Sequence, residues 1–175
     1  MKIYIEQLKK HDAKDLFTFE LTNKSFFETM VPNRGSQYFD FEYFRKLLDD
    51  LLIEQADGDS YFYLIRNEEN EIVGRINLVD IDTENRSSSL GYRVGEKFTK
   101  KGVATAAVKL ILDVAKNNEI TEVHAKTTTN NVASQIVLEK GGFSSYQNEA
   151  DTTSVVLNGE HVNFVHYIWR NTSRL

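Results

Sequence analysis

The chain contains no cysteine and only one proline, Pro32, among its 175 residues. The absence of cysteine excludes disulfide bonds, thiolate metal sites and a covalent acyl-cysteine intermediate. A single proline also leaves no proline-rich linker that would divide the chain into parts. A length of 175 residues suits one domain with one sizeable hydrophobic core. We therefore predict a single domain over residues 1–175.

The sequence also lacks long apolar runs and an excess of basic residues. No segment approaches the roughly 18 apolar residues of a membrane span, and residues 1–6 do not resemble the apolar part of a signal peptide. The formal net charge is −5, and the sequence has no basic stripe that would neutralise phosphates. Both features argue against a nucleic-acid partner. We expect a cytoplasmic protein with neither a membrane nor a nucleic acid as partner. A basic protein or an amine acceptor remains compatible with this charge.

Hydrophobic periodicity predicts a mixed α/β fold. Strands are expected over residues 3–8, 61–65, 72–79, 88–94, 122–128, 143–149, 155–157 and 162–169. Helices are expected after the capping residues Asp12 and Asp40 and over residues 103–115 and 132–140, with a loop over residues 25–37. This order predicts a mixed, mostly antiparallel central sheet flanked by helices.

The most informative segment is Thr99–Thr105, which lies between a predicted strand and a predicted helix. A strand, a loop of small residues and a helix start direct backbone N–H groups and the positive end of the helix dipole toward an anion. Gly102 gives the backbone freedom, Ala104 keeps the helix start open, and Lys100 and Lys101 add positive charge. The segment indicates a phosphate-binding site, although a glycine in an ordinary tight turn before a helix gives the same pattern without a ligand.

A second segment, Asn131 to Ser134, begins a helix about thirty residues further along the chain. The spacing of three residues puts the two side chains on nearly the same helix face. Asn131 by itself is also an ordinary helix N-cap. Together with the preceding loop, the segment points to a coenzyme A-dependent acyl transfer.

Four motifs carry a family resemblance. They are Leu90-Gly91-Tyr92-Arg93-Val94, the loop Thr99–Thr105, Asn131-x-x-Ser134 and Lys140-Gly141-Gly142-Phe143. Together they resemble the GNAT acetyltransferase superfamily, and within it the RimJ/RimL branch of bacterial N-acetyltransferases, over nearly the whole chain. The resemblance implies the GNAT fold, acetyl-CoA as cosubstrate, and direct transfer of the acetyl group to a primary amine in a ternary complex. The branch implies a protein N-terminal α-amine as acceptor, such as that of a ribosomal protein, and homodimers are common among similar proteins.

The resemblance also implies a set of coenzyme-binding residues. They are Tyr92, Arg93, Val94, Thr99, Lys100, Lys101, Gly102, Val103, Ala104, Thr105, Asn131 and Ser134. In the superfamily, the strand before the loop splays away from its neighbour, the pantetheine arm fills the opening, and an N–H near Val94 polarises the thioester carbonyl. Thr99 replaces the Arg or Gln that is usual at its position, so only the backbone of that position is carried over.

The acid and the base of the reaction are less clear in the sequence. Leu138 stands where many superfamily members carry a tyrosine general acid, and leucine cannot donate a proton. Ser134 stands where related enzymes place a group near the coenzyme sulfur, so it is the expected catalytic residue, with water as the alternative proton donor. Ser89 stands where a glutamate base is often found. The remaining base candidates, which are also ordinary as solvated loop carboxylates, are Asp80, Asp82 and Glu84.

Histidines and aromatic residues add little chemistry. His161 and His166 are five residues apart on a predicted strand and therefore point to opposite faces, so no metal site is expected. Tyr38 and Phe39 precede a predicted helix and are expected to face a substrate. Core packing is expected for Phe41 and Phe44.

Three other functions remain compatible with the sequence. The acceptor could be a small-molecule amine, such as an antibiotic, a polyamine or an amino acid. The chain could instead be a non-catalytic module that binds acyl-CoA, which the residues Ser89, Thr99 and Leu138 favour slightly, or a purely structural α/β domain.

Overall fold

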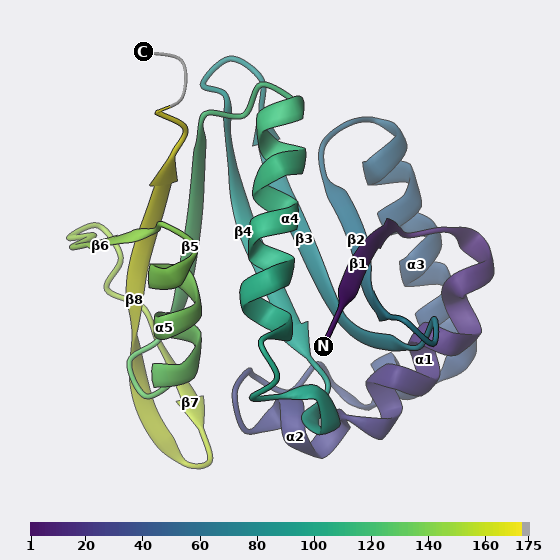
Figure 1. Ribbon diagram of the computed structural model, residues 1–175. Coiled ribbons are helices and arrows are strands. Elements are labelled where there is room, and N and C mark those ends of the chain that lie inside the picture. The colour runs from purple at the N-terminus through teal and green to yellow at the C-terminus, as the bar shows by residue number, and fades with distance from the viewer. Residues whose placement is uncertain (173–175) are drawn as a thin grey trace.

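A sheet of eight strands runs through the molecule in the spatial order β1-β2-β3-β4-β5-β8-β6, with β7 paired to β8. The computed structural model describes residues 1–172 (Figure 1). Every neighbouring pair is antiparallel except β4 and β5, which run parallel. The predicted mixed, mostly antiparallel sheet is therefore confirmed. The strands are β1 (Ile3–Gln7), β2 (Tyr61–Asn67), β3 (Ile72–Asp82), β4 (Ser87–Val94), β5 (Glu122–Thr128), β6 (Ser144–Tyr146), β7 (Ser154–Leu157) and β8 (Glu160–Arg170).

Helices cover both faces of this sheet (Figure 1). On one face, α4 and α5 share a core with Val73, Ile76 and Leu78 of β3. On the other face, α1, α2 and α3 share a second core with Phe62 and Leu64 of β2. No helix within residues 1–172 is long and apolar enough to cross a membrane. The helices are α1 (Ala13–Thr22), α2 (Lys24–Glu28), α3 (Phe41–Ala56), α4 (Val103–Asn117) and α5 (Val132–Lys140), with short 3₁₀ turns η1 (Lys10–Asp12), η2 (Ser36–Phe39) and η3 (Glu96–Phe98).

The predicted helix starts are confirmed where the capping interaction is local. The Asp40 carboxylate accepts a hydrogen bond from the Tyr43 N–H at 3.0 Å and caps α3. The segment expected to be a loop over residues 25–37 contains most of α2, a helix too short to show clear periodicity, and part of η2. The strand expected over residues 143–149 is limited to β6.

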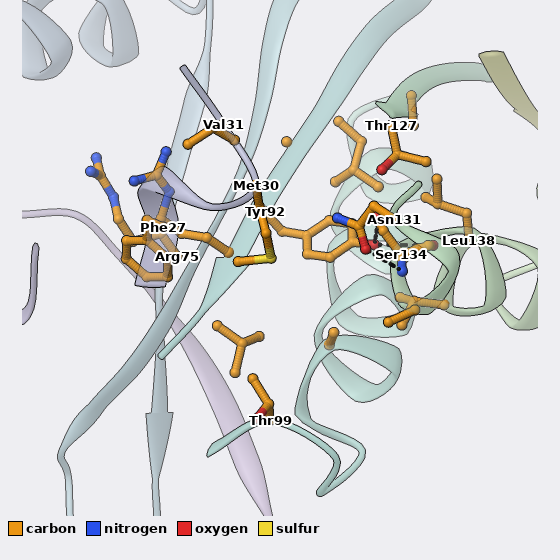
Figure 2. A pocket seen from close by; sticks show the side chains of 18 of the residues that line it. Phe27, Met30, Val31, Arg75, Tyr92, Thr99, Thr127, Asn131, Ser134 and Leu138 are labelled. Atoms are coloured by element: carbon orange, nitrogen blue, oxygen red, sulfur yellow. Dashed lines mark hydrogen bonds between the residues drawn. The ribbon is translucent and has the colours of Figure 1, made fainter. Parts of the chain in front are cut away.

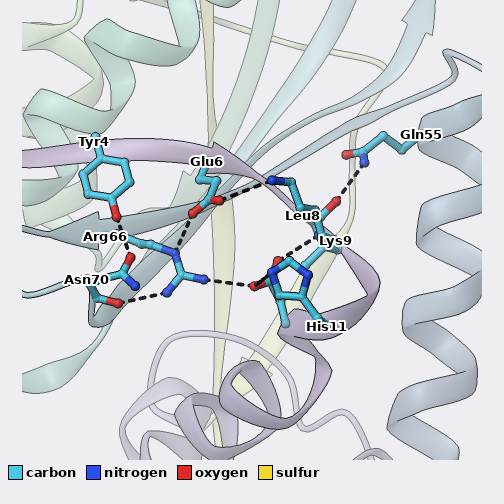
Figure 3. A network of polar contacts seen from close by, with 9 residues as sticks. Tyr4, Glu6, Leu8, Lys9, His11, Gln55, Arg66 and Asn70 are labelled. Carbon is cyan, nitrogen blue, oxygen red and sulfur yellow. Dashed lines mark hydrogen bonds and ion pairs between the residues drawn. The ribbon is translucent and has the colours of Figure 1, made fainter.

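Asp12 does not cap α1 as predicted, because its carboxylate has other partners. It accepts hydrogen bonds from the Lys9 N–H at 2.8 Å and from Nη2 of Arg66 at 3.0 Å. Arg66 also donates to Glu6 at 2.9 Å and to the Asn70 carbonyl at 3.0 Å (Figure 3). A buried carboxylate requires a charged or hydrogen-bonded partner, and here a strand residue supplies it. The network joins the N-terminal strand to β2.

The pairing of β4 with β5 stops halfway along the strands. Only three residue pairs connect them, from Ser87 opposite Glu122 to Ser89 opposite His124. Beyond this point β5 continues to pair with β8 on its other edge, while β4 continues to pair with β3. The C-terminal halves of β4 and β5 therefore separate, as expected, and open the centre of the sheet.

Candidate functional site

A cavity of about 830 Å³ lies where β4 and β5 separate (Figure 2). Its walls come from residues 90–94 of β4, residues 125–128 of β5, the loop before α4, the start of α5, and the segment from α2 to Arg34. The volume is in the range of small-molecule and cofactor sites. All predicted coenzyme-binding residues line this cavity except Lys101, whose Nζ lies 5.8 Å from the centre of the Phe98 ring.

The loop before α4 has the backbone geometry of an anion site. Gly102 adopts a φ of 76° and Lys100 a φ of 60°, both in the left-handed region. A Cβ on Gly102 would meet no atom within 4 Å, so the backbone conformation, and not the space, favours glycine there. No side chain caps α4, so the first N–H groups of the helix at Val103, Ala104 and Thr105 are available to a ligand.

The Thr99 side chain has a local role in this loop. Its hydroxyl donates to the Glu96 carbonyl at 2.8 Å, which closes η3. Thr99 lines the cavity, yet its hydroxyl proton is already used. A contribution of the Thr99 backbone to coenzyme binding stays a prediction.

The open edge of β4 presents backbone N–H groups to the cavity. Gly95, just after the strand, donates its N–H to the Val73 carbonyl of β3 at 2.8 Å. Because successive N–H groups of a strand point to opposite edges, the Val94 N–H points toward β5, where pairing has ended. Fixed backbone dipoles of this kind are well suited to stabilise an oxyanion.

A tyrosine and a serine meet across the cavity at the start of α5. The Asn131 side chain caps α5 by accepting from the Ser134 N–H at 3.1 Å, as predicted. The Ser134 Oγ lies 2.8 Å from the Tyr92 phenolic oxygen, and either atom can be the donor (Figure 2). Burial raises the pKa of Tyr92 to about 12, so the phenol keeps its proton at neutral pH. Leu138, at the position of the missing tyrosine, is buried in the same wall.

The side chain of Tyr92 is the group that sequence reasoning missed. The sequence analysis assigned Tyr92 a place along the pantetheine arm. Its hydroxyl reaches Ser134 across 42 residues of sequence, and no local pattern signals a contact of that range.

The side chains that line the cavity and carry a charge at neutral pH are all basic. They are Arg34, Arg75, Arg93, Lys100, Lys126 and Lys140, and within residues 1–172 no Asp, Glu or His lines it. This contrasts with the net charge of −5 of the whole chain. The cavity is therefore a positively charged region in an acidic protein.

The carboxylates proposed as base candidates do not reach this cavity. Asp80, Asp82 and Glu84 lie in and beside the turn between β3 and β4, and none of them lines the cavity. The register of these strands places Asp82 beside Ser87, at the opposite end of β4 from the opening. Hydrogen bonds from the Asn85 N–H and side chain and from the Glu84 N–H lower the pKa of Asp82, which serves the turn.

One buried carboxylate holds two of the arginines. Glu20 of α1, which is 1% exposed, accepts from Nη1 of Arg75 at 2.7 Å and from Nη1 of Arg93 at 3.1 Å. Burial alone would raise the pKa of Glu20, but the charges of Arg75 and Arg93 lower it. Likewise, burial alone would lower the pKa of Arg75, but the Glu20 carboxylate raises it. The three groups are charged together at neutral pH.

Tyr38 and Phe39 do not line the large cavity, contrary to the expectation that they face a substrate there. Tyr38 is buried, and its hydroxyl accepts from Nη1 of Arg34 at 3.0 Å and from Nη1 of Arg75 at 3.3 Å. Phe44 is buried in the core as predicted, whereas Phe41 is 36% exposed and its ring forms a T-shaped pair with Phe17. Tyr38 therefore holds the side chains of Arg34 and Arg75 through hydrogen bonds to its hydroxyl.

Comparison with known proteins places this architecture in a family. The family profile described as "Acetyltransferase (GNAT) domain" matches residues 2–144. The chain belongs to the GNAT acetyltransferase family. This GNAT N-acetyltransferase is 26% identical over 144 residues to "Probable N-acetyltransferase YjcK" of Bacillus subtilis. The aligned residues cover 81% of this chain and 80% of YjcK.

Solved structures of similar fold include two ribosomal-protein acetyltransferases. The ribosomal-protein-S5-alanine acetyltransferase of Vibrio fischeri superposes with a TM-score of 0.86 at 18% identity, covering 99% of this chain and 95% of that one. RimL, a ribosomal L7/L12 α-N-protein acetyltransferase in complex with coenzyme A, superposes with a TM-score of 0.85 at 20% identity, covering 97% and 94%. The resemblance to the RimJ/RimL branch is thus confirmed at the level of the fold.

Proposed function

We propose that this GNAT enzyme transfers the acetyl group of acetyl-CoA to a protein N-terminal α-amine. The observation that carries the proposal is the lining of the cavity, with six basic side chains and, within residues 1–172, no carboxylate or imidazole. An α-amine has a pKa of about 7.7–8.0, whereas a lysine amine has a pKa of about 10.4. Nearby positive charge disfavours the ammonium form further. Where no carboxylate or imidazole of residues 1–172 lines the cavity to take up the proton, an α-amine loses its proton far more easily than a lysine or a polyamine does.

The names of the similar structures support an N-terminal acceptor on a ribosomal protein. One is a ribosomal-protein-S5-alanine acetyltransferase and another a ribosomal L7/L12 α-N-protein acetyltransferase. Their identities to this chain, 18% and 20%, extend to the fold only, so the ribosomal acceptor is part of the proposal. Such an acceptor agrees with the cytoplasmic location expected from the sequence.

The residues around the cavity fit acetyl-CoA, which supplies the acetyl group as a reactive thioester. The N–H groups at the start of α4 and the Lys100 ammonium would hold the pyrophosphate. The open edge of β4 would bind the pantetheine amides, and the Val94 N–H would donate to the thioester carbonyl. Asn131 fixes the start of α5 and with it the position of Ser134.

Ser134 and Tyr92 would together protonate the leaving thiolate. As the amine nitrogen bonds to the acetyl carbon, the carbon–sulfur bond breaks and the sulfur requires one proton. The Ser134 hydroxyl would give its proton to the sulfur and take one from the Tyr92 phenol, whose oxygen lies 2.8 Å from the Ser134 Oγ. The proton that the amine nitrogen loses on becoming an amide would return through solvent to the Tyr92 oxygen. The raised pKa of Tyr92 keeps the phenol protonated at neutral pH, so the phenol has a proton to donate toward Ser134.

The test is a comparison of acceptors at saturating acetyl-CoA. Thiol release and mass spectrometry would follow three acceptors: a lysine-free peptide with a free N-terminus, an N-terminally blocked peptide with one lysine, and spermidine. We expect release with the first peptide only, with a rate that rises with pH as the α-amine of the peptide titrates. Release with spermidine or the blocked peptide but not with the free N-terminus would overturn the proposal. Binding of acetyl-CoA without release from any acceptor would support a non-catalytic module instead.

A further inference from the structure

Three arginines gather at the end of the cavity away from Ser134. Arg75 lies on β3, Arg93 on β4, and Arg34 in the segment after α2, and all three line the cavity. Figure 2 shows Arg75 and Phe27 at one end of the cavity, with Asn131 and Ser134 at the other. We call this end, formed by Arg34, Arg75 and Arg93, the acceptor end.

Two of these arginines stand directly opposite each other. Arg75 and Arg93 are register partners on adjacent antiparallel strands. Like charges at such positions destabilise a sheet. Their placement is therefore unfavourable unless anions compensate it.

Protein groups compensate only part of this charge. Glu20 is the sole carboxylate that pairs with Arg75 or Arg93 within residues 1–172. Arg34 has a neutral partner, the Tyr38 hydroxyl. Lys24 and Glu28, which line a small adjoining cavity, add one charge of each sign. Counting them, four cations face two carboxylates, and two positive charges remain.

The arginines also retain unused hydrogen-bond donors. Within residues 1–172, each of the three forms side-chain hydrogen bonds through Nη1 alone, to Glu20 or Tyr38. A guanidinium group has five N–H donors in a planar fork that suits a carboxylate. Burial, followed by the charges of Arg34 and Arg75, lowers the pKa of Arg93 to about 10 even though Glu20 opposes this. At Arg93, burial and the two neighbouring arginine charges together outweigh the Glu20 carboxylate.

An unpartnered acceptor lies beside these donors. Asn77 follows Arg75 by two residues on β3, so the two side chains share a face. The Oδ1 atom of Asn77 is buried and has no hydrogen-bond partner within residues 1–172, and Asn77 lines the cavity. The acceptor end thus offers donors for an anion together with one acceptor for an N–H group.

We propose that the acceptor end binds a carboxylate of the acceptor, so that the enzyme prefers peptides with an acidic residue at the second or third position. This inference rests on the proposed function. The unused guanidinium donors would hold the carboxylate, and Asn77 would accept from an N–H of the peptide. The same charge excludes polyamines, which would add positive charge to an already uncompensated cluster.

The test compares acidic and amide peptides that are otherwise identical. Peptides beginning Ser-Asp and Ser-Asn would be compared by kcat/KM at constant ionic strength. Because a hydrogen bond to a charged group contributes about 1.5–3 kcal/mol, we expect a preference of about tenfold or more for the acidic peptide. The variants Arg34→Gln and Arg93→Gln should each reduce this preference to about twofold or less, and Arg34→Gln should do so without changing the KM for acetyl-CoA.

The control variant is Arg45→Gln, which removes an exposed arginine of α3 that pairs with Glu42 outside the cavity. It should keep the full preference. Should Arg93→Gln fail to fold because of its contact with Glu20, Arg34→Gln still decides the question, since the hydrogen-bond partner of Arg34 among residues 1–172 is the neutral Tyr38 hydroxyl.

Several outcomes would overturn the inference. Equal rates for both peptides would exclude a carboxylate subsite while leaving N-terminal acetylation intact, whereas no acetylation of any peptide would overturn the proposed function itself. A preference that survives in both arginine variants would locate the recognition elsewhere. A preference for free alanine over alanine amide, without any preference between the two peptides, would assign the subsite to the α-carboxylate of an amino acid. It would overturn the inference that the subsite binds an acidic side chain of a peptide.

Discussion

The two ends of the cavity are built by different means. The end formed by the loop before α4, where acetyl-CoA is proposed to bind, is called the coenzyme end. There the backbone forms the site: Gly102 turns the chain, and the first N–H groups of α4 have no side-chain cap. At the acceptor end, Arg75 of β3 and Arg93 of β4 meet on one buried carboxylate, Glu20, and Arg34 from the segment after α2 donates to the Tyr38 hydroxyl. A site made by local backbone geometry suits a ligand that is constant across a family. A site made by side chains can change its ligand by substitution without altering the fold.

The largest expected effect comes from removing the carboxylate at the acceptor end. Glu20→Gln leaves Arg75 and Arg93 buried and facing each other without their shared anion. Loss of one partner of a buried ion pair destabilises a protein by about 3–5 kcal/mol. Urea unfolding at pH 7 would measure this loss. The exposed variant Glu42→Gln is the control and should change the free energy of unfolding by less than about 0.5 kcal/mol.

The effect of Glu20→Gln should also depend on pH. Because the pKa of Glu20 is lowered from 4.5 in the folded protein, its ionised form contributes stability that is fully present above about pH 4.5. This contribution is lost as the pH falls through the folded-state pKa. The difference in stability between the wild type and Glu20→Gln should therefore shrink below pH 4.5. A constant difference from pH 7 down to the acid transition would contradict the ionic role of Glu20.

The next effect concerns the chemistry between the two ends. Ser134→Ala should lower kcat by about 10²-fold, the lower range of general acid catalysis, with little change in the affinity for acetyl-CoA measured by calorimetry. Tyr92→Phe keeps the buried ring and removes only the hydroxyl that contacts Ser134, so a smaller loss of about tenfold in kcat is expected. Equal losses of turnover and coenzyme affinity in Ser134→Ala would show that Ser134 binds and does not act in the reaction.

The smallest effect should come from the backbone of the coenzyme end. Gly102→Ala places a side chain at a φ of 76°, which costs about 1–2 kcal/mol in the left-handed region and shifts the loop. We expect roughly tenfold weaker acetyl-CoA binding, with the preference among acceptor peptides unchanged.

Gly159→Ala is the matched control for this loop. It has the same backbone strain, at a φ of 82°, and equally open surroundings, but it lies in the turn between β7 and β8. It should lose stability without losing coenzyme affinity. If both variants bind acetyl-CoA like the wild type, the Gly102 loop does not hold the coenzyme.

The contrast between the two ends also explains what could be read from the sequence. The caps of α3 and α5 were predictable because Asp40 and Asn131 act on N–H groups three residues away. The cap expected from Asp12 failed because its carboxylate binds Arg66, 54 residues further along the chain. Tyr38 was expected at a substrate, but its hydroxyl accepts from an arginine 37 residues away. Predictions held where the partner is local and failed where it is distant.

The amino-acid sequence by itself determined the order of the strands and helices, the turn at Gly102 and the family, because each depends on periodicity or on contacts within a few residues. Only the tertiary structure decided which side chains distant in the sequence meet at the cavity. Glu20 meets its arginines across 55 and 73 residues, and Tyr92 meets Ser134 across 42. Strand register and helix packing bring these residues together, so the cluster of positive charge at the acceptor end forms only when the chain folds.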